Sequence, residues 1–376
     1  MHRKFADAID AIVRARGRSP RPRSRRRGVL LVSSGGLGDT ILFSLIAPRF
    51  LNLAEADEPV DLIVRSDTAA ADFLYPPRMR VRAVDYRRFL RNPLYRLRTS
   101  LDVSAAAYRV ALSTDHLRLP GVDDALVAAS GADERYAMTP RSWPKHDAKL
   151  ARNRQHYSDW FAVPEGMAHR MVRWTDFANW VMKRSDPMPV VRFDPDRLPA
   201  PTRFKSPTVV VHPFSAIRER QHSFALFTKI VAALQSDHHV VLSAGPGDLD
   251  RNPEYRVLSA QPRVRLDEGS LEAKAAALRG ARFVVTVDTS VMHLAVGTGV
   301  PTLCLASAAH VVDSVPYDSR ITPDSVRFLY HDMACRGCLG SCIHPYEDGM
   351  YPCVARLDAK VVMDALADMV ARTAHV

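Results

Sequence analysis

The strongest constraint on the fold is a set of short apolar runs that recur along the chain between helix-like segments. The runs are GVLLVSS (28–34), VDLIVRS (60–66), RVALSTD (109–115), TVVVHPF (208–214), HVVLSAG (239–245), RFVVTVD (282–288) and PTLCLAS (301–307). Most are continuously apolar rather than alternating, as expected of parallel strands that helices cover on both faces. The pattern predicts a doubly wound α/β fold.

A proline-rich stretch separates these runs into two groups. Six prolines lie from Pro187 to Pro207, and this density prevents regular structure. We therefore predict a basic arm over 1–27, a Rossmann-like domain over 28–183, a linker over 184–207 and a second Rossmann-like domain over 208–376. Ligands of such sheets bind beyond the carboxyl ends of the strands, so the sites of both domains should face one interdomain cleft.

The net charge of +11 is concentrated at the N-terminus. Residues 1–27 hold ten Lys and Arg against Asp7 and Asp10, a net of +8, and the rest of the chain carries only +3. The arm, rather than the body, is basic, and we expect no nucleic-acid partner. We expect a short helix over 3–16 and disorder beyond it. The arm is either a solvated tail or an element drawn to anionic lipid, at about 1 kcal/mol per basic residue near the surface.

Two further features bear on the location of the chain. No apolar run reaches the roughly 18 to 20 residues that span a bilayer. SRRRGVLLVSSGG (24–36) is similar to a twin-arginine export signal, but glycines break its apolar part and a cleavage site is missing. We expect a cytoplasmic protein, peripheral at the inner face of the cytoplasmic membrane.

The stretch VVTVDTSVMHLAVGTGVPTLCL (284–305) places polar residues where an apolar strand ends and a helix begins. Asp288, Thr289 and Ser290 are all good N-cap residues, yet a helix needs only one. His293 shares a helix face with Ser290. This excess of polar side chains indicates a binding site rather than a simple cap.

A glycine-rich turn follows the first predicted strand, in SSGGLGDTILFS (33–44). Gly36 and Gly38, with Gly35, permit a tight turn and close approach of a ligand, and Asp39 begins the next helix. The spacing differs from that of dinucleotide-binding turns, and a carboxylate there would repel a pyrophosphate. Asp39 is either an N-cap or a general base for a hydroxyl group.

Two more strand ends in the C-terminal half carry polar loops. The first, HPFSAIRERQHS (212–223), contains Ser215, Arg218 and Arg220, which would suit a phosphate or form a solvated loop. The second, AGPGDLD (244–250), contains Asp248, which could accept from ribose hydroxyls or merely form a turn.

Taken together, these segments resemble the family-9 glycosyltransferases, the ADP-heptose:lipopolysaccharide heptosyltransferases. The matching segments are GLGD (36–39), VVVHPFSAIRER with Phe227 (209–227), LSAGPGD (242–248), LEAKAAALRGARFVVTVDTSVMHLAVGTGVP (271–301) and the tail from Cys335, with SGADERYAM (130–138) in the first half. The resemblance spans roughly residues 28 to 370. Its most specific part is the DT-x-x-MHLA element.

The resemblance implies a GT-B fold, with the donor bound by the C-terminal half and the acceptor by the N-terminal half. It also implies a catalytic base at the position of Asp39. For the donor it implies a set of ligands to phosphate, ribose and sugar, with no catalytic metal: Ser215, Arg220, Asp248, Asp288, Thr289, Ser290 and His293. The activity implied is inverting transfer of a sugar, such as heptose from ADP-heptose, to a lipopolysaccharide-core or related glycan.

The chain departs from the family at several of these positions. Arg220-Gln221-His222-Ser223 replaces the usual Lys-x-Trp-Pro, and Ser290 replaces a glycine. Two other functions therefore stay open. One is a nucleotide-sugar hydrolase or epimerase, and the other is a catalytically silent assembly protein at the membrane surface.

Four of the five cysteines lie close together in the tail, over 335–353. They are spaced Cys335-x2-Cys338-x3-Cys342-x10-Cys353, whereas Cys304 lies apart in an apolar run. Disulfides are rare in the cytoplasm, so a structural four-thiolate site for zinc or iron is one interpretation. Free or redox-active thiols are the other.

Overall fold

The chain forms two compact units in the structure, a computed structural model that describes residues 2–17, 27–166 and 168–374. The first unit comprises Met1–Gly166 and Arg173–Pro187, and the second comprises Met167–Val172 and Met188–Val376. The later division falls inside the predicted linker, 184–207. Nothing in the sequence indicated that the short piece 167–172 belongs with the second unit.

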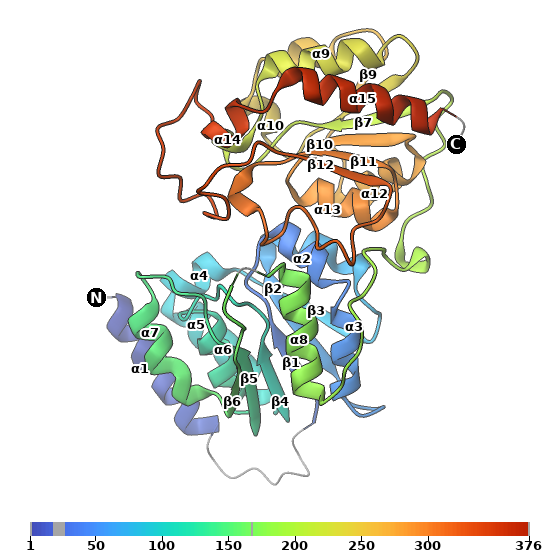
Figure 1. Ribbon diagram of the computed structural model, residues 1–376. Coiled ribbons are helices and arrows are strands. Elements are labelled where there is room, and N and C mark those ends of the chain that lie inside the picture. The colour runs from blue at the N-terminus through green and yellow to red at the C-terminus, as the bar shows by residue number, and fades with distance from the viewer. Residues whose placement is uncertain (1, 18–26, 167, 375–376) are drawn as a thin grey trace. The chain divides into compact units, whose positions relative to one another are not determined.

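The first unit is built on a six-stranded parallel sheet in the order β3-β2-β1-β4-β5-β6 (Figure 1). Val29 of β1 is in register with Val60 of β2 and Val110 of β4, so β1 and β4 lie side by side at the centre. The strands are β1 Val29–Val32, β2 Val60–Arg65, β3 Met79–Val84, β4 Val110–Ser113, β5 Glu134–Met138 and β6 Asp159–Phe161.

Helices cover both faces of this sheet. The residues of α1, α4, α5 and α6 that face inwards form one apolar core, and aromatic rings of α2, α3 and α8 pack together on the other side. The helices are α1 His2–Gly17, α2 Leu37–Phe43, α3 Ala47–Phe50, α4 Tyr86–Arg91, α5 Pro93–Ala105, α6 Asp123–Ser130, α7 Asp147–Asn153 and α8 Arg170–Met182.

The second unit repeats this architecture with the strand order β12-β11-β10-β7-β8-β9. Val209 of β7 is in register with Phe283 of β10, so the first and fourth strands of the unit are again central neighbours. The strands are β7 Thr208–His212, β8 His239–Ser243, β9 Val264–Asp267, β10 Phe283–Val287, β11 Thr302–Leu305 and β12 Val326–Leu329.

Figure 1 shows α9 and α15 on one face of the second sheet and α12 and α13 on the other. The core under α9 and α15 includes Phe227, Ile230 and Leu366, all almost fully buried. The helices are α9 Phe224–Leu234, α10 Asp248–Arg251, α11 Tyr255–Ser259, α12 Leu271–Gly280, α13 Ser290–Thr298, α14 Pro352–Ala355 and α15 Ala359–Thr373.

The predicted α/β fold of two Rossmann-like units is confirmed, and all seven predicted runs contain a strand. Five strands were missed: β3, β5, β6, β9 and β12. Their sequences mix charged and apolar residues, as MRVRAV in β3 and ERYAM in β5 show. Because β3, β6, β9 and β12 are edge strands, they need less continuous apolar sequence than the central strands.

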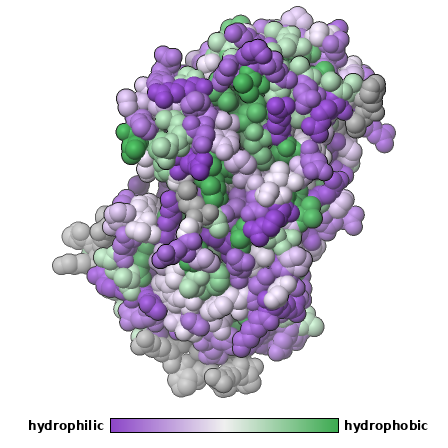
Figure 2. Space-filling view, in the orientation of Figure 1, coloured by the Kyte–Doolittle hydropathy of each residue, from purple (hydrophilic) through white to green (hydrophobic). Residues whose placement is uncertain are grey.

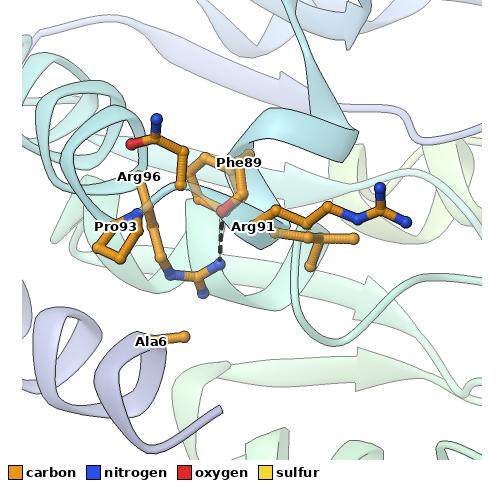
Figure 3. A pocket seen from close by; sticks show the side chains of 7 residues that line it. Ala6, Phe89, Arg91, Pro93 and Arg96 are labelled. Carbon is orange, nitrogen blue, oxygen red and sulfur yellow. Dashed lines mark hydrogen bonds between the residues drawn. The ribbon is translucent and has the colours of Figure 1, made fainter. Parts of the chain in front are cut away.

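The predicted N-terminal helix is confirmed as α1, but it is docked on the first unit and does not form a free arm. Val13 is fully buried, and the carboxylate of Asp10 accepts from Arg96 Nε and Nη2 at 2.7 and 2.6 Å. Figure 3 shows Arg96 beside the carbonyl of Phe89, with Ala6 of α1 opposite, around a cavity of about 10 Å³ that has room for one water. The rest of the predicted arm, 18–26, lies outside the described residues.

Within the described ranges no helix is long and apolar enough to cross a bilayer. Figure 2 shows a face that is mainly hydrophilic, with hydrophobic residues in small groups rather than one broad patch.

The docking of α1 should depend on its buried ion pair. We expect Asp10→Ala to lower the free energy of unfolding by about 3–5 kcal/mol, because it leaves the guanidinium of Arg96 buried without its carboxylate. Asp7 on the same helix is the matched control, since it is exposed and lies 3.3 Å from Lys149 Nζ. Asp7→Ala should cost less than about 1 kcal/mol. Urea denaturation measures both, and equal losses would mean that the buried pair does not hold the helix.

Candidate functional site

The candidate donor residues gather where the order of the second sheet reverses. β7 and β10 are neighbours there, although β8 and β9 lie between them in the chain. Loops that leave two such strands diverge to opposite faces of the sheet, so the crevice between them is the usual ligand site of this fold. The loop after β7 carries Arg220, and the turn after β10 carries Asp288.

Arg220 and Asp288 form a buried ion pair across this crevice. Arg220 Nη2 donates to Asp288 Oδ2 at 2.7 Å and to the Asp288 carbonyl at 2.8 Å, while Ser307 Oγ donates to the same Oδ2 at 3.0 Å. Only 2% of the Asp288 side chain and 13% of the Arg220 side chain are exposed. The sequence predicted both residues at the site, but not their contact with each other.

The pair is not fully satisfied within the part of the chain that the structure describes. Arg220 Nε, Asp288 Oδ1 and Thr289 Oγ1 are buried and have no hydrogen-bond partner there. A buried polar atom without a partner costs about 1–3 kcal/mol. These atoms belong to the loop after β7 and the turn after β10, so unpaired polar groups are concentrated where these two segments meet.

The first turn of α13 supplies the next part of the site. Thr289 is its N-cap, with φ −135° and ψ −177°, but its side chain makes no capping hydrogen bond. Ser290 is the first helical residue and is half-buried. The free N–H groups of such a turn and the helix dipole favour an anion.

Neutral imidazoles lie behind this turn. His293 Nδ1 is 2.7 Å from the hydroxyl of Tyr317, and the two rings stack at 5.8 Å. Burial lowers the pKa of His293 well below its usual value, and Arg170 and other cations add to the effect. Burial likewise lowers the pKa of His310 to about 4. Near neutral pH these rings are uncharged, so the positive charge of the site comes from arginine.

Two predicted donor ligands use their side chains locally. Ser215 Oγ accepts from the backbone N–H of Ile217 at 3.3 Å. Asp248 accepts from the backbone N–H of Gly245 and from Arg251, each at 2.6 Å. These contacts are those of loop-forming residues, and the ligand roles predicted for Ser215 and Asp248 stay predictions.

The first sheet reverses its order between β1 and β4, and Asp39 lies just after β1. Its Oδ2 accepts from the backbone N–H of Gly36 at 2.8 Å, which closes the turn that Gly36 and Gly38 form at the start of α2. This contact holds the carboxylate at the edge of the sheet where β1 ends. The N-cap of α2 is thus Gly36 rather than Asp39, and Asp39 accepts from the N-cap N–H as the third residue of the helix. The catalytic role of Asp39 stays a prediction.

A second group of carboxylates, which the sequence did not predict, lies at this edge. Asp115 follows β4, and its Oδ2 accepts from the backbone N–H of Ser34 at 2.5 Å. Burial raises the pKa of Asp123 well above its usual value, and the nearby charge of Asp115 raises it further. The sequence could have indicated Asp115, because this residue ends the predicted strand run 109–115. Asp288 ends the run 282–288 in the same way.

Adjacent carboxylates in α6 should respond to the same change in opposite ways. Because the pKa of Asp123 is raised in the folded state, its ionised form opposes folding, and the cost grows as pH rises above the pKa of the unfolded chain. The free energy of unfolding of the Asp123→Asn variant at pH 7 should therefore equal or exceed that of the wild type. Between pH 4, near the ordinary Asp pKa, and pH 7, it should also decrease less with rising pH than in the wild type.

Asp124→Asn is the control, one residue away. Asp124 pairs with Arg118 at 2.8 Å, and both side chains are 0% exposed, so this change should cost about 3–5 kcal/mol at pH 7. Thermal denaturation across pH measures both variants. A large loss for Asp123→Asn at pH 7 would contradict the assignment of an unfavourable buried charge.

The four tail cysteines lie near one another but do not form a recognisable metal site. Burial raises the pKa of the Cys353 thiol, and the thiols of Cys338, Cys335 and Cys342 raise it further, so all four are within electrostatic range. The segment is tied to the second unit, since Gly337 and Leu339 donate to the carbonyls of Ala308 and Ala309. Among the residues described, no three His, Cys, Asp or Glu side chains are grouped to hold a metal ion.

Comparisons with known proteins agree with this geometry. Residues 169–331 match the model of glycosyltransferase family 9 (heptosyltransferase). A search of curated proteins found no match.

Solved structures match over most of the chain. E. coli heptosyltransferase WaaC with ADP has 18% identity and a TM-score of 0.64, covering 91% of this chain and 99% of that chain. A family-9 glycosyltransferase from Veillonella parvula has 14% identity and a TM-score of 0.67, covering 92% and 98%. The iron-containing dodecameric glycosyltransferase TibC from enterotoxigenic E. coli has 15% identity and a TM-score of 0.53, covering 93% and 77%.

These findings confirm the predicted GT-B fold, the predicted resemblance to family 9 and the enzyme class of a glycosyltransferase. The matched region, 169–331, contains Arg220, Asp288 and all of α13.

Proposed function

Starting from the match of residues 169–331 to glycosyltransferase family 9, we propose that the chain transfers heptose from ADP-heptose, with inversion, to a lipopolysaccharide-core or related glycan. The observation that carries the proposal is the Arg220–Asp288 pair beside the open first turn of α13. Two similar structures support the donor: WaaC is described with ADP-2-deoxy-2-fluoro heptose and TibC with ADP-D-β-D-heptose.

The donor's diphosphate would lie against the N–H groups of the first turn of α13. Arg220 would offer Nε, which has no partner in the described part of the chain, to a phosphate oxygen while Nη2 keeps Asp288 in place. A charge-assisted contact of this type stabilises a leaving group as negative charge develops on it. Asp288 Oδ1 and Thr289 Oγ1 remain for sugar hydroxyls, and Ser215, Asp248, Ser290 and His293 are proposed as further donor ligands.

Asp39 would act on the acceptor. Its carboxylate, held by the N–H of Gly36, would take the proton of an acceptor hydroxyl as that oxygen attacks the anomeric carbon. The bond to the diphosphate then breaks on the opposite side, which inverts the configuration. This proposal needs no catalytic metal, because the arginine and the helix turn take the charge of the leaving group.

The basic arm supports a further part of the proposal, namely that the acceptor is reached at an anionic membrane surface from the cytoplasm. α1 places the start of the arm on the first unit through Asp10 and Arg96. The arginines that follow it in the sequence would supply the charge for this attraction. Their attraction to anionic lipid would be lost at high salt.

The reaction is tested by following ADP release from ADP-heptose with and without a heptose-acceptor glycolipid. We expect release only when the acceptor is present. Release without the acceptor would identify a hydrolase, and absence of donor binding would identify a silent protein. In the same assay Asp39→Asn should lower turnover roughly 100-fold or more while ADP binding stays intact, because a general base acts in the transition state.

Arg220→Ala is the matched variant on the donor side. It should weaken ADP binding by about 1.5–3 kcal/mol. Arg218→Ala should change ADP binding little, since the Arg218 side chain is 68% exposed.

Unchanged turnover in a folded Asp39→Asn variant would remove Asp39 from the mechanism.

We also propose that the tail cysteines hold one structural zinc or iron ion. Thiolates are ligands that zinc and iron prefer, and a bound cation would draw together four side chains that are not grouped around a metal position in the described structure. TibC, described as iron-containing, is one of the similar structures. The loop glycines give the segment its bends, as Gly337 and Gly340 have φ of 78° and 84°.

Elemental analysis of the purified protein should then find about one equivalent of metal, which four thiolate ligands suffice to bind. Cys338→Ser should remove the metal and lower the melting temperature, because metal binding is coupled to the folding of the segment. Cys304→Ala should keep the metal, since Cys304 lies buried in β11. A metal-free protein whose melting temperature is unchanged by chelator would show that the cysteines are free thiols.

A further inference from the structure

The positive charge of residues 28–376 is concentrated in one short segment, 80–101. This segment contains seven arginines and one acidic residue, Asp85, a net of +6, whereas the whole of 28–376 carries only +3. The remainder of that region is therefore net acidic. The segment runs from β3 through α4 into α5, so its charge is confined to one part of the first unit. A local excess of positive charge attracts anionic partners.

Four of the seven arginines are not used by the fold. Arg96 pairs with Asp10, and Arg80 and Arg82 pair with Asp61. The other four are exposed and have no ion pair with a carboxylate in the described part of the chain: Arg87, Arg88, Arg91 and Arg98. Figure 3 shows Arg91 extending away from Arg96. These guanidinium groups are therefore accessible to a partner.

Exposed apolar side chains gather on the same helices. Among the described residues of the first unit five large apolar side chains are exposed, and only Leu117 lies outside α1, α4 and α5. Phe5 and Ile12 of α1 are 57% and 60% exposed, and Leu90 and Leu94 of α4 and α5 are 46% and 78% exposed. The inward residues of these helices share one core, so the helices cover one face of the sheet. Exposed apolar side chains are ordinary when scattered, but their concentration beside unpaired arginines indicates an interaction surface.

The exposed side chains of the three helices adjoin one another at the junction of α4 and α5. Leu90 and Asn92 line the small cavity that Ala6 of α1 also borders (Figure 3). Asn92 and Leu94 line a second cavity, of about 450 Å³, between the end of β3 and α5. Because Asn92 borders both cavities, the two leucines lie close to the same residue. We call this continuous area the α1–α4–α5 surface.

The second cavity gives the surface a place for a phosphate group. Arg82, Arg88 and Arg98 line it, against the single carboxylate of Asp102. The guanidinium of Arg88 lies 4.7 Å from the centroid of the Tyr95 ring, which holds it at the cavity without neutralising it. Arg88 and Arg98 are exposed, so a ligand at the surface can reach them. Three guanidinium groups around one carboxylate favour an anion.

We propose that the α1–α4–α5 surface docks on a lipid bilayer that contains anionic phospholipids. The exposed arginines would bind headgroup phosphates, and Leu90 and Leu94 would enter the boundary between headgroups and acyl chains. A soluble polyanion would use the arginines but would gain nothing from the exposed leucines, so the combination favours a bilayer. The inference rests on the membrane part of the proposed function and deepens it, because it adds a docking surface on the folded unit to the basic arm.

Flotation of the full chain with lipid vesicles tests the proposal without donor or acceptor. The chain should bind vesicles of mixed phosphatidylglycerol and phosphatidylcholine, should not bind vesicles of phosphatidylcholine alone, and should bind the mixed vesicles more weakly at high salt. A chain that transfers sugar but does not bind the mixed vesicles would overturn this inference alone. A chain that binds them but transfers no sugar would overturn only the proposed reaction.

Two substitutions separate the surface from the arm, which both leave unchanged. Arg98→Ala should weaken binding to the mixed vesicles about fivefold, the factor that corresponds to about 1 kcal/mol for one basic residue at an anionic surface. Leu94→Ser should weaken it roughly 3- to 10-fold, because the leucine side chain no longer enters the bilayer. Both positions are exposed, so the melting temperature should not change.

Arg256→Ala and Val257→Ser are the matched controls on α11 of the second unit, where these side chains are 58% and 66% exposed. Both should bind the mixed vesicles as the wild type does. Equal binding by the wild type, Arg98→Ala and Leu94→Ser would leave the arm as the membrane-binding element and refute the assignment. A loss for Arg98→Ala with none for Leu94→Ser would instead identify a surface for soluble polyanions and overturn the bilayer as its partner.

Discussion

The buried ion pair of Arg220 and Asp288 is the interaction on which the second unit's site depends. It joins the loop after β7 to the turn after β10, two segments that the crossover through β8 and β9 separates in sequence. A buried pair of this kind is costly to desolvate, and hydrophobic residues often replace one without loss of stability. It lies at the reversal of strand order, and within the described ranges one polar atom of each side chain has no partner, so a ligand explains the pair better than stability does.

Both units place carboxylates at the same point of their sheets, but the two arrangements differ in charge. In the second unit a guanidinium accompanies the carboxylate after β10, and the helix turn beside it adds further attraction for an anion. In the first unit Asp39, Asp115 and Asp123 lie around β1 and β4, with Ser34 donating to Asp115. An anionic diphosphate suits the former surroundings and a hydroxyl group suits the latter. This difference supports a donor role for the second unit and an acceptor role for the first.

The Cys-rich tail has a structural role whatever its thiols bind. It packs on the residues around 308–312, closes a cavity next to Tyr255 and contacts the β7 loop through the carbonyl of Glu219. Arg220 is the next residue after Glu219, so the tail is linked through one peptide unit to the arginine of the donor site. A displacement of the tail would therefore displace Arg220 through the backbone of this loop.

The sequence by itself determined the central strands and the two-unit organisation, and it placed candidate site residues at the strand ends. Continuous apolar runs bounded by turn residues favour buried parallel strands, and polar residues at the carboxyl ends of such strands lie at one edge of the sheet. Asp39, Arg220 and Asp288 were predicted as site residues because each follows such a run. β3 was not predicted, because its alternate arginines obscure the pattern of a strand, and α1 was predicted as part of an arm, because its contact with Arg96 lies far along the chain.

Only the tertiary structure decided which polar groups meet. Whether Asp248 serves a loop or a ligand depends on the N–H of Gly245 and the guanidinium of Arg251 beside it. The pairing of Arg220 with Asp288, the raised pKa of Asp123 and the cavity around Tyr255 all arise from segments that pack together across long sequence separations. The physical reason is that burial and electrostatic interactions depend on distance in space, whereas sequence patterns report only the neighbours along one element.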